Sequence, residues 1–102
     1  MIYILRQENT NIVKIGFSTN NKTLRKRIKA IQANCPNRLK LEAKMNGSKL
    51  KERYLHSLCF KRRIRNEWFN LTKEEVARMI EKYKNFAPTK NNIFKVSQVN
   101  HL

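Results

Sequence analysis

Two short runs of β-forming residues near the N-terminus constrain the fold of this chain most. Ile2-Tyr3-Ile4 lies in the first run, and Val13-Lys14-Ile15-Gly16 lies in the second, eleven residues further along. The segment between them, residues 7–11, is polar and turn-like. Two such runs joined by a short polar segment are typical of a β-hairpin. We therefore expect the chain to begin with a hairpin formed by residues 1–6 and 12–18.

A helix and a third strand are predicted after this hairpin. Leu24, Ile28 and Ile31 recur at helical spacing, which predicts a helix from residue 23 to residue 35, ended by Pro36. Residues 39–45 alternate between apolar and polar side chains, as in a half-exposed strand.

Two further helices are indicated by their N-terminal caps. Ser48 is a suitable cap for a helix that reaches about residue 62, and Thr72 begins a capping box for a helix that ends near residue 86. The predicted fold class is α+β, with a three-stranded antiparallel sheet flanked by three helices. We expect one domain at residues 1–86 and a short C-terminal tail at residues 87–102, which holds a β-like patch at residues 93–99.

The charge of the chain points to a polyanionic partner. Its 102 residues carry 23 Lys and Arg against 7 acidic residues, for a formal net charge of +16. Nucleic acid is the commonest partner of so basic a small domain. A membrane partner is not expected, because no apolar run approaches the roughly 18 residues that a spanning helix needs.

The chain opens directly on a strand pattern, and no signal peptide is expected. Cys35 and Cys59 lack the spacing of metal ligands and are expected to be reduced thiols. We therefore expect an intracellular protein, in the cytoplasm of a bacterial host or in a viral or host compartment.

The acidic residues restrict the kinds of metal site that this chain can build. Aspartate is absent, and the only histidines are His56 and His101. Divalent metals at phosphate sites prefer hard oxygen ligands, usually carboxylates. Nuclease sites made of aspartate clusters or of several histidines are therefore excluded, so a metal-dependent nuclease must use one or two of the glutamates: Glu8, Glu42, Glu52, Glu67, Glu74, Glu75 and Glu81.

The order of several motifs resembles the GIY-YIG nuclease superfamily over residues 1 to about 72. Ile2-Tyr3-Ile4 and Lys14-Ile15-Gly16 are followed by a helix with Arg27, a helix with Glu52, and then Asn66-Glu67-Trp68-Phe69. The second motif matches a variant group, frequent in phages and viruses, that has Lys-Ile-Gly in place of Tyr-Ile-Gly. The resemblance implies a metal-dependent endonuclease that hydrolyses phosphodiester bonds, with DNA as the favoured substrate and Mg²⁺ or Mn²⁺ as the cofactor.

The resemblance also implies catalytic roles for individual residues. Glu52 matches the metal ligand of the family, Arg27 the helix arginine that stabilises charge at the phosphate, and Tyr3 the tyrosine of the first motif. Each has a structural alternative: Glu52 could pair with neighbouring lysines, Arg27 could be one basic surface residue among several, and Tyr3 could be an ordinary buried tyrosine.

Lys14 is the main departure from the family pattern, because it replaces a tyrosine that is the candidate general base in well-studied members. A lysine can act as a base only after losing its proton, which nearby positive charge from Arg25, Arg27 or Lys29 would favour. Otherwise Lys14 contacts phosphate, and both interpretations stay open. Ile31 also stands where many members carry an aromatic residue or a histidine, so a second polar group that could help is missing.

The basic run at residues 61–65 is expected to bind the nucleic-acid backbone. His56 stands one helical turn after Glu52 and is expected to contact phosphate or to pack, rather than to bind metal. Glu67-Trp68-Phe69 is expected to be structural. The predicted nucleic-acid-binding residues are Arg25, Lys29, His56, Lys61, Arg62, Arg63 and Arg65.

Two other classes of function compete with a nuclease. One is a catalytically inactive nucleic-acid-binding module on the same scaffold, which Lys14 and Ile31 favour. The other is a basic RNA-binding or packing protein without a catalytic site. The expected partner is nucleic acid, with double-stranded DNA favoured, and the chain is expected to be a monomer or a weak dimer.

Overall fold

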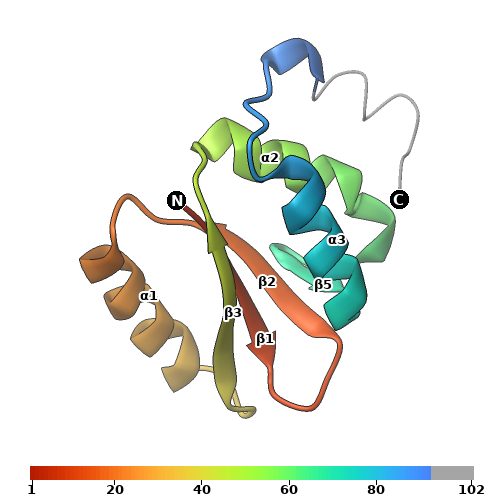
Figure 1. The fold of residues 1–102 in the computed structure, drawn as a ribbon. Helices are drawn as coiled ribbons and strands as arrows, with labels where there is room; N and C mark the ends of the chain where they lie inside the picture. Colours follow the sequence, from red (N-terminus) through yellow and green to blue (C-terminus); the bar gives the residue numbers. More distant parts are fainter. Residues whose placement is uncertain (93–102) are drawn as a thin grey trace.

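The computed structural model describes residues 1–92 of the chain, and the predicted β-like patch at residues 93–99 lies outside this range. An antiparallel sheet of five strands runs through the molecule in the order β3-β1-β2-β5-β4 (Figure 1). The strands are β1 (Ile2–Gln7), β2 (Ile12–Phe17), β3 (Leu39–Met45), β4 (Arg63–Arg65) and β5 (Trp68–Asn70). The helices are α1 (Asn21–Ala33), α2 (Lys49–Leu58) and α3 (Lys73–Tyr83), with a short 3₁₀ helix, η1 (Phe60–Arg62).

The α+β class is confirmed, but the prediction of a three-stranded sheet is wrong because the sheet has five strands. The predicted hairpin forms, with Ile2 opposite Phe17 and Arg6 opposite Val13, and β3 adds to its other side. The two missed strands, β4 and β5, have three residues each. Strands so short show too little alternation of polar and apolar residues to be recognised in a sequence.

The helix ends differ from the predicted ones where local capping decides them. Helix α1 starts at Asn21 because the Asn20 side chain accepts a hydrogen bond from Thr23 N at 2.9 Å. Helix α2 ends at Leu58 and not near residue 62, since the chain tightens into η1. The Thr72 capping box at the start of α3 is confirmed, and α3 ends at Tyr83.

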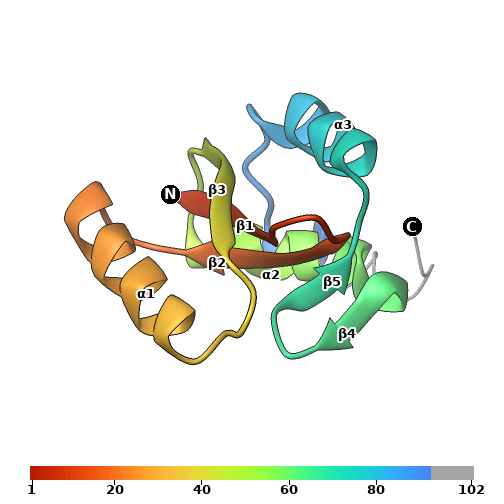
Figure 2. The same ribbon diagram turned by 90° about the horizontal axis from the view of Figure 1, so that it is seen from below.

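The helices cover both faces of the sheet. Helix α1 lies on one face, and α2 and α3 lie on the other (Figures 1 and 2). Successive β1 residues point to opposite faces, so Tyr3 and Leu5 pack with Leu24 of α1, whereas Ile2 and Ile4 belong to the larger core under α2 and α3. Within residues 1–92, no helix is both long enough and apolar enough to cross a membrane.

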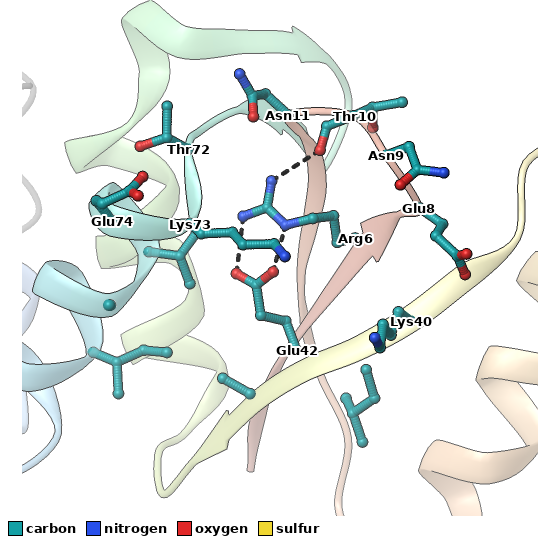
Figure 3. A pocket seen from close by; sticks show the side chains of 15 residues that line it. Arg6, Glu8, Asn9, Thr10, Asn11, Lys40, Glu42, Thr72, Lys73 and Glu74 are labelled. Atoms are coloured by element: carbon teal, nitrogen blue, oxygen red, sulfur yellow. Dashed lines mark hydrogen bonds and ion pairs between the residues drawn. The ribbon is translucent and has the colours of Figure 1, made fainter.

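Arg6 is buried, connects three parts of the fold, and is one of the residues that line a cavity of about 890 Å³ (Figure 3). Its guanidinium forms two hydrogen bonds to the Glu42 carboxylate on β3, one of them 2.8 Å long. Nη1 also donates to the carbonyl oxygens of Thr10 at 3.1 Å and Leu71 at 2.9 Å. The charge of Arg6 is therefore engaged in holding the hairpin turn, β3 and the start of α3.

Lys51 fixes the start of α2, the helix that carries Glu52. Its side chain is 3% exposed, and Nζ donates to the carbonyl oxygens of Asn46 at 2.9 Å and Lys84 at 3.3 Å. Burial lowers the pKa of Lys51 below its usual value. These contacts link the N-terminus of α2 to the C-terminal end of α3.

Candidate active site

The candidate site lies at the end of β2, where the neighbouring strand stops. Strand β5 pairs with β2 only from Ile12 to Lys14. At Ile15 the backbone N–H still donates to the carbonyl of Glu67 at 3.1 Å, but the Ile15 carbonyl accepts a hydrogen bond from His56 Nε2 at 2.8 Å. At this point of β2, the His56 side chain of α2 takes the hydrogen-bonding place that a neighbouring strand would otherwise occupy. Because no strand within residues 1–92 covers this edge of β2 at its end, side chains from both faces of the sheet can meet there.

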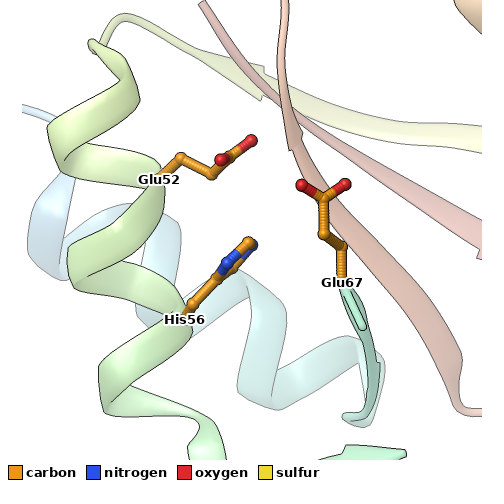
Figure 4. Close-up of side chains that lie close together, drawn as sticks. All are labelled: Glu52, His56 and Glu67. Carbon is orange, nitrogen blue, oxygen red and sulfur yellow. The ribbon is translucent and has the colours of Figure 1, made fainter. Parts of the chain in front are cut away.

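Glu52, His56 and Glu67 form the centre of the site (Figure 4). Glu52 and His56 lie one turn apart on α2, and Glu67 stands directly before β5. One potential ligand atom from each of the three lies within 4.8 Å of the others. They line a hollow of about 280 Å³ together with Arg63 and Asn66.

The environment of Glu52 is unfavourable to its negative charge. Burial raises the pKa of Glu52, and the nearby charge of Glu67 raises it further. Lys14, Lys49 and Arg27 lower this pKa and only partly offset the rise. Two glutamates held this close would bind a cation favourably, because the cation relieves their mutual repulsion.

The hydrogen bond to Ile15 determines how His56 can act. A carbonyl oxygen only accepts hydrogen bonds, so Nε2 carries the proton and Nδ1 keeps the lone pair of the neutral ring. Burial lowers the pKa of His56, although its bond to Ile15 opposes this shift. The ring also packs at 5.2 Å from the Phe69 ring, measured between centroids. His56 is therefore a packed, neutral histidine whose Nδ1 is left to accept a proton or a metal.

Tyr3 reaches the same site from the α1 face by passing over Gly16. A Cβ placed on Gly16 would lie 2.4 Å from the Tyr3 hydroxyl oxygen, so only glycine leaves room for the ring. Burial raises the pKa of Tyr3, Glu67 raises it further, and Arg27 opposes both effects. At neutral pH the Tyr3 hydroxyl is therefore protonated and able to donate a hydrogen bond.

Arg27 itself is exposed at the surface of α1, yet it is close enough to affect the pKa of both Tyr3 and Glu52. The sequence placed it at the border between core and solvent, and the structure brings it to the border of the site.

Lys14 lies between the glutamate centre and an aromatic side chain. Its Nζ is 2.7 Å from Glu67 Oε2 and 5.7 Å from the centre of the Trp68 ring. The Lys14 ammonium group is thus engaged by a carboxylate of the glutamate centre on one side and faces an aromatic ring on the other. The phosphate-contact and general-base interpretations of Lys14 both stay predictions, and the structure places its Nζ next to the glutamate centre.

The predicted nucleic-acid-binding residues fall into two groups. Arg62 is held by Glu75 through two hydrogen bonds, one of them 2.7 Å long, and its guanidinium lowers the pKa of Glu75 to about 2. This arginine therefore secures η1 to α3. The others, apart from His56, are exposed and available to phosphate: Arg25, Lys29, Lys61, Arg63 and Arg65.

Glu67 is a candidate ligand that cannot be recognised from the sequence. It was assigned a structural role because two aromatic residues follow it. The register of β5 against β2 places it opposite Ile15 and beside Glu52, and that register cannot be read from strands of three residues. The one available signal was that Glu67 is the single acidic residue between the predicted metal ligand Glu52 and Thr72.

The donor set suits a hard divalent cation. Glu52 and Glu67 supply carboxylate oxygens, which Mg²⁺ and Mn²⁺ prefer, and two carboxylates leave room for water and phosphate oxygens. Of these two carboxylates, only Glu52 is predicted from the sequence to bind the metal.

The described residues thus place a carboxylate centre at one strand end of an α+β fold, in a strongly basic chain. Comparison with known protein families matches residues 1–84 to the T5orf172 domain. The chain therefore belongs to the T5orf172 family, a phage-associated domain of the GIY-YIG/HNH-like nuclease type. No curated protein and no solved structure matches the chain.

Proposed function

We propose that this protein is an endonuclease of the GIY-YIG type that uses Mg²⁺ or Mn²⁺ to hydrolyse phosphodiester bonds in nucleic acid, with DNA as the principal substrate. The observation that carries the proposal is the convergence of Tyr3, Arg27, Glu52 and Glu67. They come from β1, α1, α2 and the residue before β5. Arg27, Glu52 and Glu67 all affect the pKa of Tyr3, and Arg27 and Glu67 also affect the pKa of Glu52. A purely structural core does not need two carboxylates, a guanidinium and a phenol at one strand end.

Each residue has a role that follows from its charge and protonation. Glu52 and Glu67 would hold the cation, which when bound polarises the phosphate and stabilises negative charge on its oxygens. Arg27 can donate to the phosphate oxygens from the opposite side, and the protonated Tyr3 hydroxyl can orient water or phosphate. Lys14 would hold phosphate, and the neutral His56 keeps Nδ1 as a proton acceptor near the centre.

One observation favours a second function, a nucleic-acid-binding module without catalysis. Lys14 occupies the position of the family's candidate base, and its Nζ is engaged by the Glu67 carboxylate instead of being free to meet a water molecule. If no other group, such as His56, activates water, the site would bind phosphate without cutting it.

A nicking assay on supercoiled DNA separates the two functions. We expect the parent protein to convert supercoiled plasmid to nicked circles with Mg²⁺ and to leave it intact in EDTA. We also expect Glu52→Gln to abolish nicking while leaving DNA affinity in a gel-shift assay nearly unchanged, because only one of 7 acidic residues is lost from a strongly basic chain.

Glu74→Gln is the matched control for this assay. Glu74 is exposed in the first turn of α3 and does not line the glutamate centre, so this variant removes the same charge elsewhere. Nicking by Glu52→Gln at the rate of Glu74→Gln would refute the proposed site. DNA binding by the parent protein without any nicking would establish the binding module instead.

A further inference from the structure

A second cavity, of about 510 Å³, lies beside the candidate site on the α1 face of the sheet. Trp68 of β5 lines it, and Ala30 and Ile31 of α1 line it as well. Lys14 of β2 belongs both to this cavity and, through Glu67, to the glutamate centre. The ion pair between Lys14 and Glu67 therefore connects the cavity to the candidate active site.

We propose that this cavity binds an unpaired base of the nucleic-acid substrate, stacked on Trp68, next to the phosphodiester bond that is cut. The proposal rests on the proposed function and adds a base subsite to it. It follows that the substrate has unpaired nucleotides at or beside the cleavage point.

The chemistry of the cavity fits a base better than a phosphate. Trp68 offers an aromatic surface, and base–aromatic stacking tolerates every base because each has a π-face. Ile31 and Ala30 add apolar surface, while the amides of Gln7 and Asn34 can donate and accept hydrogen bonds. Lys14 is the one cationic side chain among the lining residues, so the cavity lacks the cluster of positive charges that phosphate sites use.

The position of Lys14 connects this base to the reaction. Its Nζ lies 2.7 Å from Glu67 and 5.7 Å from the Trp68 ring centre. A base is joined to its phosphate through one sugar, so a nucleotide whose phosphate meets Lys14 can place its base over Trp68. Lys14 would then orient the phosphate and also form the wall of the base subsite that faces the glutamate centre.

Stacking on Trp68 requires the base to leave a duplex or to be unpaired beforehand. Within a duplex both faces of each base are covered by neighbouring base pairs, and extrusion of a paired base costs more than use of an unpaired one. The geometry therefore selects single strands, bulges, flaps and branch points over uninterrupted duplex.

Trp68 allows a direct test because it is the only tryptophan of the chain. Its fluorescence is followed while the protein is titrated in EDTA with oligothymidylate or with an abasic deoxyribose-phosphate oligomer of equal length. Both have the same phosphates, and only the first has bases. We expect oligothymidylate to quench Trp68 and the abasic oligomer to bind without quenching. Equal quenching by both would overturn the proposal, since it would show that Trp68 senses phosphate alone.

Two substitutions of leucine for alanine test the cavity itself. Ala30 and Ala33 are both exposed on α1, but only Ala30 lines the cavity. Ala30→Leu should remove the quenching and weaken oligothymidylate binding by about tenfold, the scale of one lost stacking contact. Ala33→Leu should behave as the parent, and affinity for the abasic oligomer should not change in either variant. Identical behaviour of the two variants would contradict a base in this cavity.

Failure of this inference can be told apart from failure of the proposed function. The titration needs neither metal nor cleavage, so quenching by bases in a protein that never cuts DNA would support the subsite and refute the nuclease. Cleavage without base-dependent quenching would support the nuclease and refute the subsite.

Discussion

The Tyr3 ring lies directly over Gly16 on the neighbouring strand, where the two residues face each other in the β1–β2 register. This pairing explains why a tyrosine in the first strand accompanies a glycine in the second. The glycine is needed for the space above it, since its φ is not positive and no unusual backbone conformation is involved.

We predict that Gly16→Ala displaces the Tyr3 ring. A methyl group at residue 16 would lie 2.3 Å from Tyr3 Cζ, so the ring must move out of a position where it is 1% exposed. Overpacking of this kind lowers the free energy of unfolding by about 1–3 kcal/mol, which urea unfolding would measure. The nicking rate should fall as well, because the Tyr3 ring is displaced from the site. The double variant Tyr3→Leu/Gly16→Ala should lose much less stability than the two single variants added together. Strict additivity would show that the two side chains do not meet.

Glu52→Gln should make the metal-free protein more stable at neutral pH. Burial and Glu67 raise the pKa of Glu52 in the folded state above its unfolded value, so the ionised carboxylate destabilises the fold once the pH exceeds the unfolded value. Thermal unfolding in EDTA at pH 7 measures this effect, and Mg²⁺ should raise the midpoint of the parent more than that of the variant. If Glu52→Gln were less stable than the parent in EDTA, the negative charge of Glu52 would not destabilise the fold, and this prediction would be wrong.

Phosphate contacts should make DNA binding strongly salt-dependent. With about five phosphates contacted, the slope of log K against log[salt] is expected near −4 to −5 for duplex DNA. Arg63→Gln or Arg65→Gln should make the slope shallower by about one. Arg62→Gln should leave it unchanged, because Arg62 is paired with Glu75. A flat salt response of the parent would refute a phosphate-dominated interface.

Lys14→Arg should keep near-parent nicking, whereas Lys14→Met should lose it. Arginine can preserve both the ion pair with Glu67 and a contact to phosphate, but it cannot accept a proton from water. Rates of nicking and gel-shift affinities are compared for the two variants. Severe loss of cleavage in the arginine variant with intact binding would identify Lys14 as the general base.

The sequence predicted those parts of the structure that depend on long periodic patterns or on local caps. The hairpin, β3 and the Thr72 capping box follow from such patterns and are present. Strands β4 and β5 do not follow from such patterns, because three residues are too few to show a period and β5 pairs with β2, which is distant in the sequence.

The same limit applies to the site. Tyr3, Arg27 and Glu52 could be named from the order of motifs, although their roles stay predictions. Glu67 and the Trp68 cavity depend on how β5 lies against β2, which is a tertiary contact that spacing along the chain does not encode. The ion pair between Lys14 and Glu67 could not be predicted for this reason, since the two partners are separated by 53 positions in the sequence.

The Mg²⁺ dependence of nicking by Glu67→Gln tests most directly whether the two glutamates hold one cation together. Initial rates are measured on supercoiled DNA across a range of Mg²⁺ concentrations for the parent, Glu67→Gln and the control Glu74→Gln. We predict that Glu67→Gln needs at least about tenfold more Mg²⁺ for half-maximal rate, as expected when one of two carboxylate ligands is lost, and that Glu74→Gln matches the parent. The same Mg²⁺ requirement in Glu67→Gln and the parent would contradict a shared metal site.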